Sequence, residues 1–246
     1  MVNNKTLSEY CHQYLAVDNF SDYCPNGLQV EGKAEVNKII AGVSANLDLI
    51  EKAIDEKADA VLVHHGFFWK SENPSLTGIK KNRIKALLEH DINLFAYHLP
   101  LDAHPVVGNN IQLAMRLNIA TPTAIGDTLV WQGEAHSSLL EVAQAVQNIT
   151  QRTPLVFGNK DKNINKIAWC TGGAQSYIEH AIEAGADCFI SGEVSEQIPA
   201  IAKENNIAYI SAGHHATERY GVQALCQHLS TKFNLDYQYV DIDNVV

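Results

Sequence analysis

Residues 61–66, Val-Leu-Val-His-His-Gly, decide how the rest of the sequence is interpreted. Three branched apolar residues predict a buried strand, and two adjacent histidines follow it directly. Successive side chains of a strand point to opposite faces, so both imidazoles reach one site only where the strand ends and the backbone turns. Ligands of open α/β sheets bind beyond the carboxyl ends of the strands. The stretch therefore predicts a functional site at the end of a buried strand.

Strands and helices alternate on both sides of this stretch. Apolar runs and helical spacing predict three strands separated by two helices, in the order 38–43, 46–57, 59–65, 79–90 and 92–98. This alternation is typical of parallel βαβ units.

Two further segments precede the alternating part. Ser8 is interpreted as the cap of a first helix that runs to about Val17. The turn-rich loop 21–32 contains Pro25, Asn26 and Gly27. A loop of this length is either a lid or a segment that packs near a site.

The second half of the chain repeats the first. Asn37-Lys38-Ile39 recurs without a gap as Asn165-Lys166-Ile167, and Ala58-Asp59 recurs as Ala186-Asp187. The following segment, 91–95, matches 206–210 at a shorter shift, which leaves 66–78 as extra loop in the first half. The predicted fold class is α/β, with two similar βαβ-type domains from an internal duplication. We expect mixed sheets flanked by helices and a metal site between the domains.

The junction between the repeats is expected in a stretch rich in turn residues, 119–165, with a helix at 137–151. The predicted domains are therefore 1–125 and 126–246, the second either separate from the first or intertwined with it.

Residues of the metal-ligand type occur at three strand ends. They are the pair His64-His65, the segment from His98 to Asp102, and the segment from His214 to Glu218. A histidine and a glutamate four residues apart lie on one face of a helix and can chelate a metal. Other interpretations remain open at this point: Asp102 as a helix cap, the His214 and Glu218 pair as a surface ion pair, and His98 as an orienting donor.

Taken together, three imidazoles and two carboxylates exceed the ligands of one closed tetrahedral site. They suit two divalent metals about 3.5–4 Å apart, which predicts hydrolysis as the reaction class. Glu193 takes the position of the histidine pair in the second half, so we expect it as a base, as an orienting group or as a solvated carboxylate. The run Thr171-Gly172-Gly173 is interpreted as a tight turn, with an anion cradle as the alternative.

Composition excludes several classes of protein. The net charge of −10 counts against nucleic-acid binding, which needs a basic surface. Five cysteines without a C-x-x-C pair predict reduced thiols. The polar first residues and the lack of a long apolar run predict neither a signal peptide nor a membrane span. We expect a cytoplasmic protein.

The motifs jointly resemble the Nif-three-like dinuclear metal centre family, often labelled GTP cyclohydrolase I type 2 homolog, and its YbgI branch in particular. The resemblance covers essentially the whole chain. It is carried by residues 22–32 (Asp-Tyr-Cys-Pro-Asn-Gly-Leu-Gln-Val-Glu-Gly), 63–66 (Val-His-His-Gly), 98–102 (His-Leu-Pro-Leu-Asp), 191–193 (Ser-Gly-Glu) and 213–218 (Gly-His-His-Ala-Thr-Glu).

This resemblance implies a homohexameric ring whose metal sites face the interior. It implies a dinuclear metal centre with Glu218 as the bridging ligand. Mixed imidazole and carboxylate ligands suit zinc, iron, manganese or nickel. The implied ligands are His64, His65, Asp102, His214 and Glu218.

Two hypotheses of function follow. The first is a metal-dependent hydrolase acting on a small nucleotide-like or phosphorylated substrate, in a role such as the handling of damaged nucleotides, with His98 and Glu193 in proton transfer or orientation. The second is a non-catalytic metal protein, a metal chaperone or an assembly scaffold. The lability of the bound metal distinguishes them, since a structural site is closed and a catalytic site keeps an open position.

Overall fold

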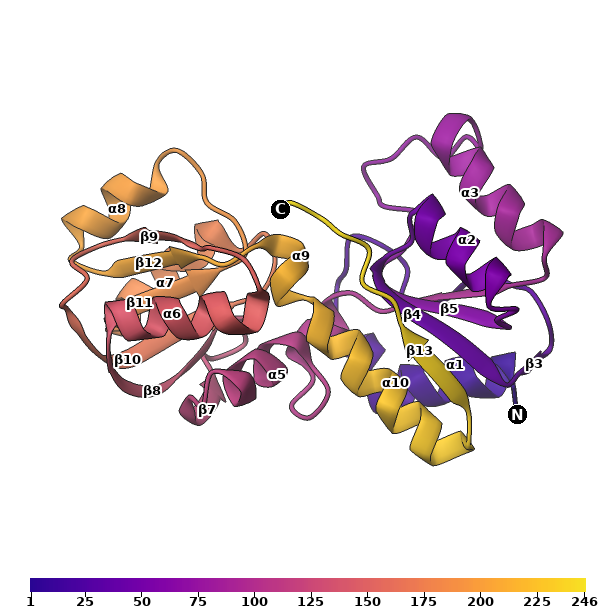
Figure 1. Ribbon diagram of the computed structural model, residues 1–246, viewed down its shortest axis with the longest axis horizontal. Helices are drawn as coiled ribbons and strands as arrows, with labels where there is room; N and C mark the ends of the chain where they lie inside the picture. Colours follow the sequence, from indigo (N-terminus) through magenta and orange to yellow (C-terminus); the bar gives the residue numbers. More distant parts are fainter. The chain divides into compact units, whose positions relative to one another are not determined.

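The structure is a computed structural model that describes residues 1–246, and it is a mixed α/β protein (Figure 1). The chain divides into two compact units. Unit 1 comprises residues 1–108 and 221–243, and unit 2 comprises residues 109–220 and 244–246. No helix is both long and apolar enough to cross a membrane.

This division differs from the expected boundary near residue 125. The boundary lies after Gly108, and the chain returns to unit 1 over Gly221–Asp243. The return has a physical basis, because strand β13 (Asp236–Tyr239) adds in parallel to β4 (Lys38–Ser44) of the first unit. The two units are thus intertwined along the chain.

Unit 1 is built on a five-stranded sheet in the order β13-β4-β5-β6-β2. Its central strands β4, β5 and β6 are parallel, and β2 is antiparallel to β6. A small ladder of β1 and β3 lies beside it. The remaining strand bounds are β1 (Val2–Asn3), β2 (Gly27–Val30), β3 (Glu35–Val36), β5 (Ala60–His65) and β6 (Asn93–Ala96).

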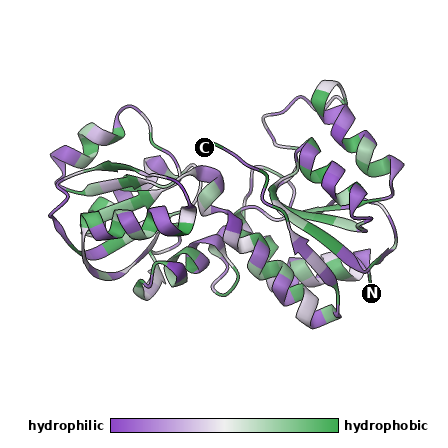
Figure 2. Cartoon of the chain, in the orientation of Figure 1, coloured by the Kyte–Doolittle hydropathy of each residue, from purple (hydrophilic) through white to green (hydrophobic).

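Alternate strand residues of this sheet face two separate cores. Ile39 and Leu62 pack on one face against α1 (Asn4–Tyr14) and α10 (Arg219–Phe233). Ile40 and Val61 pack on the other face against α2 (Leu47–Asp55) and α3 (Gly78–Glu89). The centre of the sheet is therefore a buried middle layer, which explains why β4, β5 and β6 are mostly apolar (Figure 2).

The first helix begins earlier than predicted. Helix α1 starts at Asn4, with Asn3 as its cap, because the Asn3 side chain accepts a hydrogen bond from the Lys5 N–H. Ser8 lies inside the helix and does not cap it. Several elements of unit 1 were not predicted. Strand β2 lies inside the stretch 21–32 that was expected to be a loop. The others are β1, β3, a short 3₁₀ helix at Val17–Asn19, helix α4 (Leu99–Ala103), α10 and β13.

Unit 2 is built on a six-stranded sheet in the order β7-β8-β10-β11-β12-β9. Its central strands β10, β11 and β12 are parallel, and the other three pair antiparallel. The bounds are β7 (Ala120–Ala124), β8 (Trp131–Ser138), β9 (Leu155–Phe157), β10 (Asn163–Cys170), β11 (Cys188–Ser191) and β12 (Ala208–Ser211).

Helices cover both faces of this sheet as well. The faces of α5 and α6 pack with Ile167 and Ile190, whereas α7 and α8 pack with Ala168 and Phe189. A short 3₁₀ helix precedes α7. The bounds are α5 (Asn109–Arg116), α6 (Leu139–Thr150), the 3₁₀ helix (Gln175–Tyr177), α7 (Ile178–Glu183), α8 (Ile198–Glu204) and α9 (His214–Thr217).

The internal repeat is visible in the strand register. Ile39 pairs with Ala60 in unit 1, and the residues at the same repeat positions, Ile167 and Cys188, pair in unit 2. Ala60 pairs with Asn93, and Cys188 pairs with Ala208, as the shorter shift predicts. The duplicated sequence pattern thus corresponds to a duplicated set of three parallel strands.

Candidate functional site

The carboxyl end of β5 carries a group of three imidazoles within unit 1. His64, His65 and His98 each offer a ring nitrogen within 4.8 Å of the others, and their ring centroids are 4.6–5.7 Å apart. Asp102 Oδ1 lies 3.5 Å from His64 Nε2. These four residues are called the histidine cluster. They form a set of nitrogen and oxygen ligands that suits a divalent transition metal.

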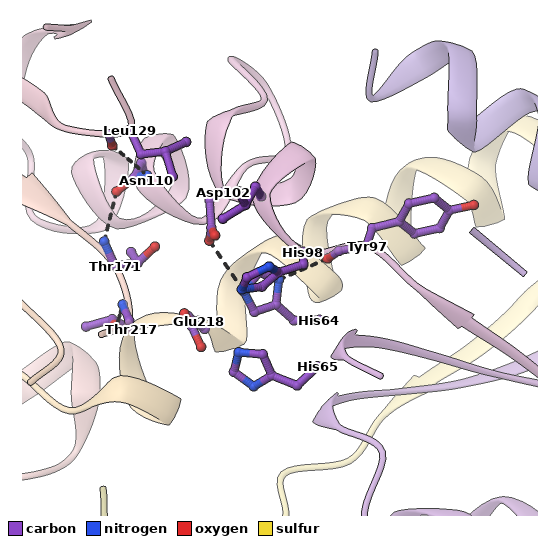
Figure 3. A network of polar contacts seen from close by, with 12 residues as sticks. His64, His65, Tyr97, His98, Asp102, Asn110, Leu129, Thr171, Thr217 and Glu218 are labelled. Atoms are coloured by element: carbon purple, nitrogen blue, oxygen red, sulfur yellow. Dashed lines mark hydrogen bonds and ion pairs between the residues drawn. The ribbon is translucent and has the colours of Figure 1, made fainter. Parts of the chain in front are cut away.

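The orientation of the His64 ring is fixed by a hydrogen bond at Nδ1. Its Nδ1–H donates to the Tyr97 carbonyl at 2.9 Å, and the ring is completely buried (Figure 3). This bond selects the tautomer whose Nε2 carries a lone pair, and Nε2 is the atom that faces Asp102. His65 is held differently, with Nδ1 3.1 Å from Ser44 Oγ.

Asp102 owes its position to helix α4 at the end of β6. Pro100 occupies the first turn of this short helix, where its missing N–H leaves no bond unmade. The helix buries Asp102 and aims it at His64.

Asp22 joins the histidine cluster from the turn-rich loop, and the sequence did not single it out. Its carboxylate accepts bonds from His98 Nδ1 at 2.7 Å, from the Leu99 N–H at 3.0 Å and from Asn26 Nδ2 at 2.8 Å. Burial raises the pKa of Asp22, but these bonds and the charge of His98 outweigh it and lower the pKa to about 2. Asp22 is therefore ionised, and it leaves His98 Nε2 as the free nitrogen.

The same loop is tied down at two more points. Asn26 Oδ1 accepts the His98 backbone N–H, and Gln29 Oε1 accepts the Phe67 N–H at 2.7 Å each. The sequence left this loop as either a lid or a segment that packs near a site. The structure shows it packed against the strand ends. Its Asp, Asn and Gln residues are the signal that identifies it, because each bonds to a strand end.

Unit 2 carries a second group, which is called the carboxylate cluster and consists of Glu193, His214 and Glu218. His214 Nε2 lies 3.2 Å from Glu218 Oε2, and His214 Nδ1 donates to Glu193 Oε1 at 2.6 Å. Burial lowers the pKa of His214, but hydrogen bonds to Glu218 and Glu193 and their charges raise it to about 9. Glu193 is thus placed as an orienting partner of His214.

Glycines at the strand ends of unit 2 make room for this cluster. Gly172 has a φ of +70°, and a Cβ there would lie 2.0 Å from Glu218 Oε1. A Cβ at Gly192 would lie 2.7 Å from the Cα of His214. The Gly172 N–H donates to Thr217 Oγ1 at 3.0 Å, which ties the turn to α9. The run Thr171-Gly172-Gly173 is therefore a tight turn whose backbone adjoins the cluster.

Two residues near this turn are structural. Asn110 Oδ1 accepts the Thr171 N–H at 3.1 Å, and Asn110 Nδ2 donates to the Leu129 carbonyl (Figure 3). His215 is buried, and its backbone N–H donates to the Val246 carbonyl. All five cysteines are buried, and none forms a disulfide.

The fold and its strand-end clusters define a class of two-unit α/β protein with histidine and carboxylate groups of the metal-ligand type. The family model for Duf34/NIF3 (NGG1p interacting factor 3) matches residues 2–244. The chain belongs to this family.

Known proteins agree over the full length. A Haemophilus influenzae protein named GTP cyclohydrolase 1 type 2 homolog is 50% identical over 250 residues, which covers 99% of each chain. The solved structure of protein ybgI, of unknown function, is 46% identical over 100% of both chains, with a TM-score of 0.95. Reduced HcgD from Methanocaldococcus jannaschii is 26% identical over 98% of both chains, with a TM-score of 0.86. These likenesses confirm the family and the mixed α/β fold.

Proposed function

We propose that the histidine cluster and the carboxylate cluster together hold two divalent metal cations, and that the protein is a metal-dependent hydrolase of a small nucleotide-like substrate. Handling of damaged nucleotides would be one such role. The proposed ligands are His64, His65, Asp102, His214 and Glu218, with Glu218 as the bridging ligand. The name GTP cyclohydrolase 1 type 2 homolog, given to relatives about 48% identical, supports a nucleotide as the substrate.

One observation carries this proposal. In each unit an imidazole is held by its Nδ1–H, His64 by the Tyr97 carbonyl and His214 by Glu193. In each unit the opposite nitrogen, Nε2, faces a carboxylate, Asp102 or Glu218. This arrangement of an anchored histidine beside a second ligand is typical of metal sites.

Chain connectivity also supports joint action of the clusters. The chain passes between the units after Gly108, after Tyr220 and after Asp243. Asp102 lies six residues before the first crossing, and Glu218 lies two residues before the second. One proposed ligand of each cluster is therefore close in sequence to a crossing between the units.

Bound divalent cations lower the pKa of a water ligand and polarise the group under attack. The residues of the chain supply the remaining functions. His98 accepts a proton at Nε2, because Asp22 holds its Nδ1–H. Glu193 keeps the ring of His214 in the orientation that binding requires. Imidazole and carboxylate ligands accept zinc, iron, manganese or nickel.

The test combines metal content with activity. The protein is purified with several divalent metals, and its metal is counted by mass spectrometry beside hydrolysis assays on nucleotides and phosphate esters. We expect two metals per chain and ester hydrolysis in at least one metal form. Asp102→Ala and Glu218→Ala each lower the metal content by one or more, while His90→Ala, an exposed histidine outside the clusters, retains it.

Full metal occupancy with no activity in any metal form contradicts the hydrolase. Slow metal exchange in that inert protein then favours the metal chaperone or scaffold. We further propose a homohexameric ring, as the family resemblance implies, and a location in the cytoplasm, as expected from the sequence. Light scattering tests the ring, with an expected mass of six times the 27.1 kDa chain.

A further inference from the structure

We propose that Arg152 binds a phosphate group of the substrate beside the carboxylate cluster. This inference rests on the proposed function and names the chemical class that the site accepts. Arg152 follows helix α6, and its Nη1 is shielded from solvent without a hydrogen-bond acceptor in the chain. The residue as a whole is half-buried, so part of it remains exposed.

The other arginines of unit 2 have structural partners. Arg219 Nη2 donates to the Thr150 carbonyl at 2.7 Å and so caps the end of α6. Arg116 donates to Gln112 and stacks on the ring of Tyr220, 4.1 Å from its centroid. Arg152 has no such partner and makes no ion pair. A shielded guanidinium nitrogen without an acceptor is costly, and an anion from outside the chain would satisfy it.

Arg152 packs directly against Gly213. A Cβ at Gly213 would lie 2.6 Å from both Cδ and Nη1 of Arg152, so the guanidinium lies against the Gly213 backbone. Gly213 has a φ of +103° and precedes His214 directly. The guanidinium therefore lies within a few ångströms of the backbone that carries a proposed metal ligand.

Charge identifies the ligand class. The carboxylate cluster supplies two carboxylates, Glu193 and Glu218, in a chain with a net charge of −10. An anionic substrate is repelled by this background unless a fixed cation adjoins the site. The planar fork of a guanidinium matches two oxygens of a phosphate, which makes arginine the preferred side chain for this contact.

The test measures binding to the metal-loaded protein by calorimetry, with inorganic phosphate, guanosine 5′-triphosphate and guanosine as probes. Arg152→Ala is compared with Arg152→Lys, which keeps the charge and loses the fork. The matched control is Lys160→Ala, which also removes one exposed cation. The Lys160 carbonyl accepts the Leu140 N–H at the start of α6. Lys160 and Arg152 therefore lie at opposite ends of a 12-residue helix, about 18 Å long.

We expect Arg152→Ala to weaken the binding of phosphate and of the triphosphate about tenfold or more, as loss of a charge-assisted pair predicts. Arg152→Lys falls between this variant and the wild type, and Lys160→Ala binds as the wild type does. Guanosine affinity, metal content and melting temperature stay unchanged in all three variants.

Wild-type phosphate affinity in Arg152→Ala, at full metal content, overturns the anion site, and so does a wild-type protein that binds neither phosphate probe. A different outcome contradicts the proposed hydrolase activity. Arg152-dependent phosphate binding in a protein that hydrolyses no ester supports the anion site and contradicts only the reaction.

Discussion

The two units share one strand register but differ at the ends of their strands. Ser44, His64 and His98 stand at three strand ends of unit 1, whereas the repeat positions in unit 2 hold Gly172, Gly192 and Gly213. Unit 1 therefore presents imidazoles directly from its strands. Unit 2 removes those side chains, and the space admits His214 and Glu218 from α9 and the side chain of Arg152.

This comparison shows which positions of the duplicated fold are alike in the two units and which are different. Asp59 and Asp187 occupy the same repeat position, and each accepts two backbone N–H groups at the start of the first parallel strand. These carboxylates maintain the strand register and are retained in both units. The residues at the opposite, carboxyl ends of the strands carry the chemistry, and they are different in the two units.

The largest expected effect comes from adding a side chain to one of the glycines at the strand ends of unit 2. Gly192→Ala places a Cβ 2.6 Å from the Gly172 carbonyl and 2.7 Å from the Cα of His214, both of which are backbone atoms. We expect a loss of about 3 kcal/mol in the free energy of unfolding, because the backbone must move. Urea denaturation measures it.

Gly173→Ala is the matched control, since the contacts of its Cβ are no closer than 3.4 Å and it lies at the same turn. Equal stability of the two variants would mean that the glycine at position 192 does not serve the approach of α9.

The next largest effect is expected from Asp22, the carboxylate of unit 1 that accepts a hydrogen bond from His98. Asp22→Asn removes the ionised acceptor of His98 and lowers the free energy of unfolding by about 2 kcal/mol at pH 7, since the pKa of Asp22 is lowered to about 2. This stabilisation is fully present above pH 4, the range of the unfolded pKa, and is lost as the pH falls through the folded pKa of about 2. Denaturation at pH 7 and at pH 2 measures the difference.

The wild type should therefore lose its advantage over Asp22→Asn as the solution is acidified. An advantage that persists undiminished to pH 2 would show that the carboxylate of Asp22 does not act through its charge. Gln29→Ala provides a comparison, because it also releases the loop but carries no titrating group.

The smallest expected effect tests whether Asp59 and Asp187 have the same structural role in the two units. Asp59→Asn and Asp187→Asn each weaken two charge-assisted backbone bonds, at a cost of about 1–2 kcal/mol. We expect similar losses and faster hydrogen exchange at Lys38 and Lys166, respectively. An effect confined to one of the two aspartates would show that the repeat positions have diverged in their structural role.

Much of the fold followed from local sequence patterns. The apolar runs located β4, β5 and β6 of unit 1 within two residues, and the repeat predicted equivalent strands in unit 2. The strands of the junction were missed for a physical reason. β7 is largely exposed, and β8 contains few apolar residues, so neither shows the alternation that predicts a strand.

The sequence also identified the strand ends from which the histidines and carboxylates of both clusters come. The hydrogen-bond partners of those residues were harder to predict from the sequence. Asp22 is 76 positions from His98, and the acceptor of His64 is a backbone carbonyl that no residue type indicates. Arg152 lies after a helix end with no motif around it. Contacts of this kind arise from the packing of segments that are distant in the chain.

The sequence by itself determined the two sets of parallel strands and the residue types at their ends, because hydrophobic periodicity and repeated residues are local properties. Only the tertiary structure decided where the units divide, since β13 pairs with β4 across almost 200 residues. It also decided which nitrogen of His64 faces Asp102 and which carboxylate each ring nitrogen of His214 contacts. That choice depends on hydrogen bonds to Tyr97 and Glu193, which form only when the strand ends have been assembled.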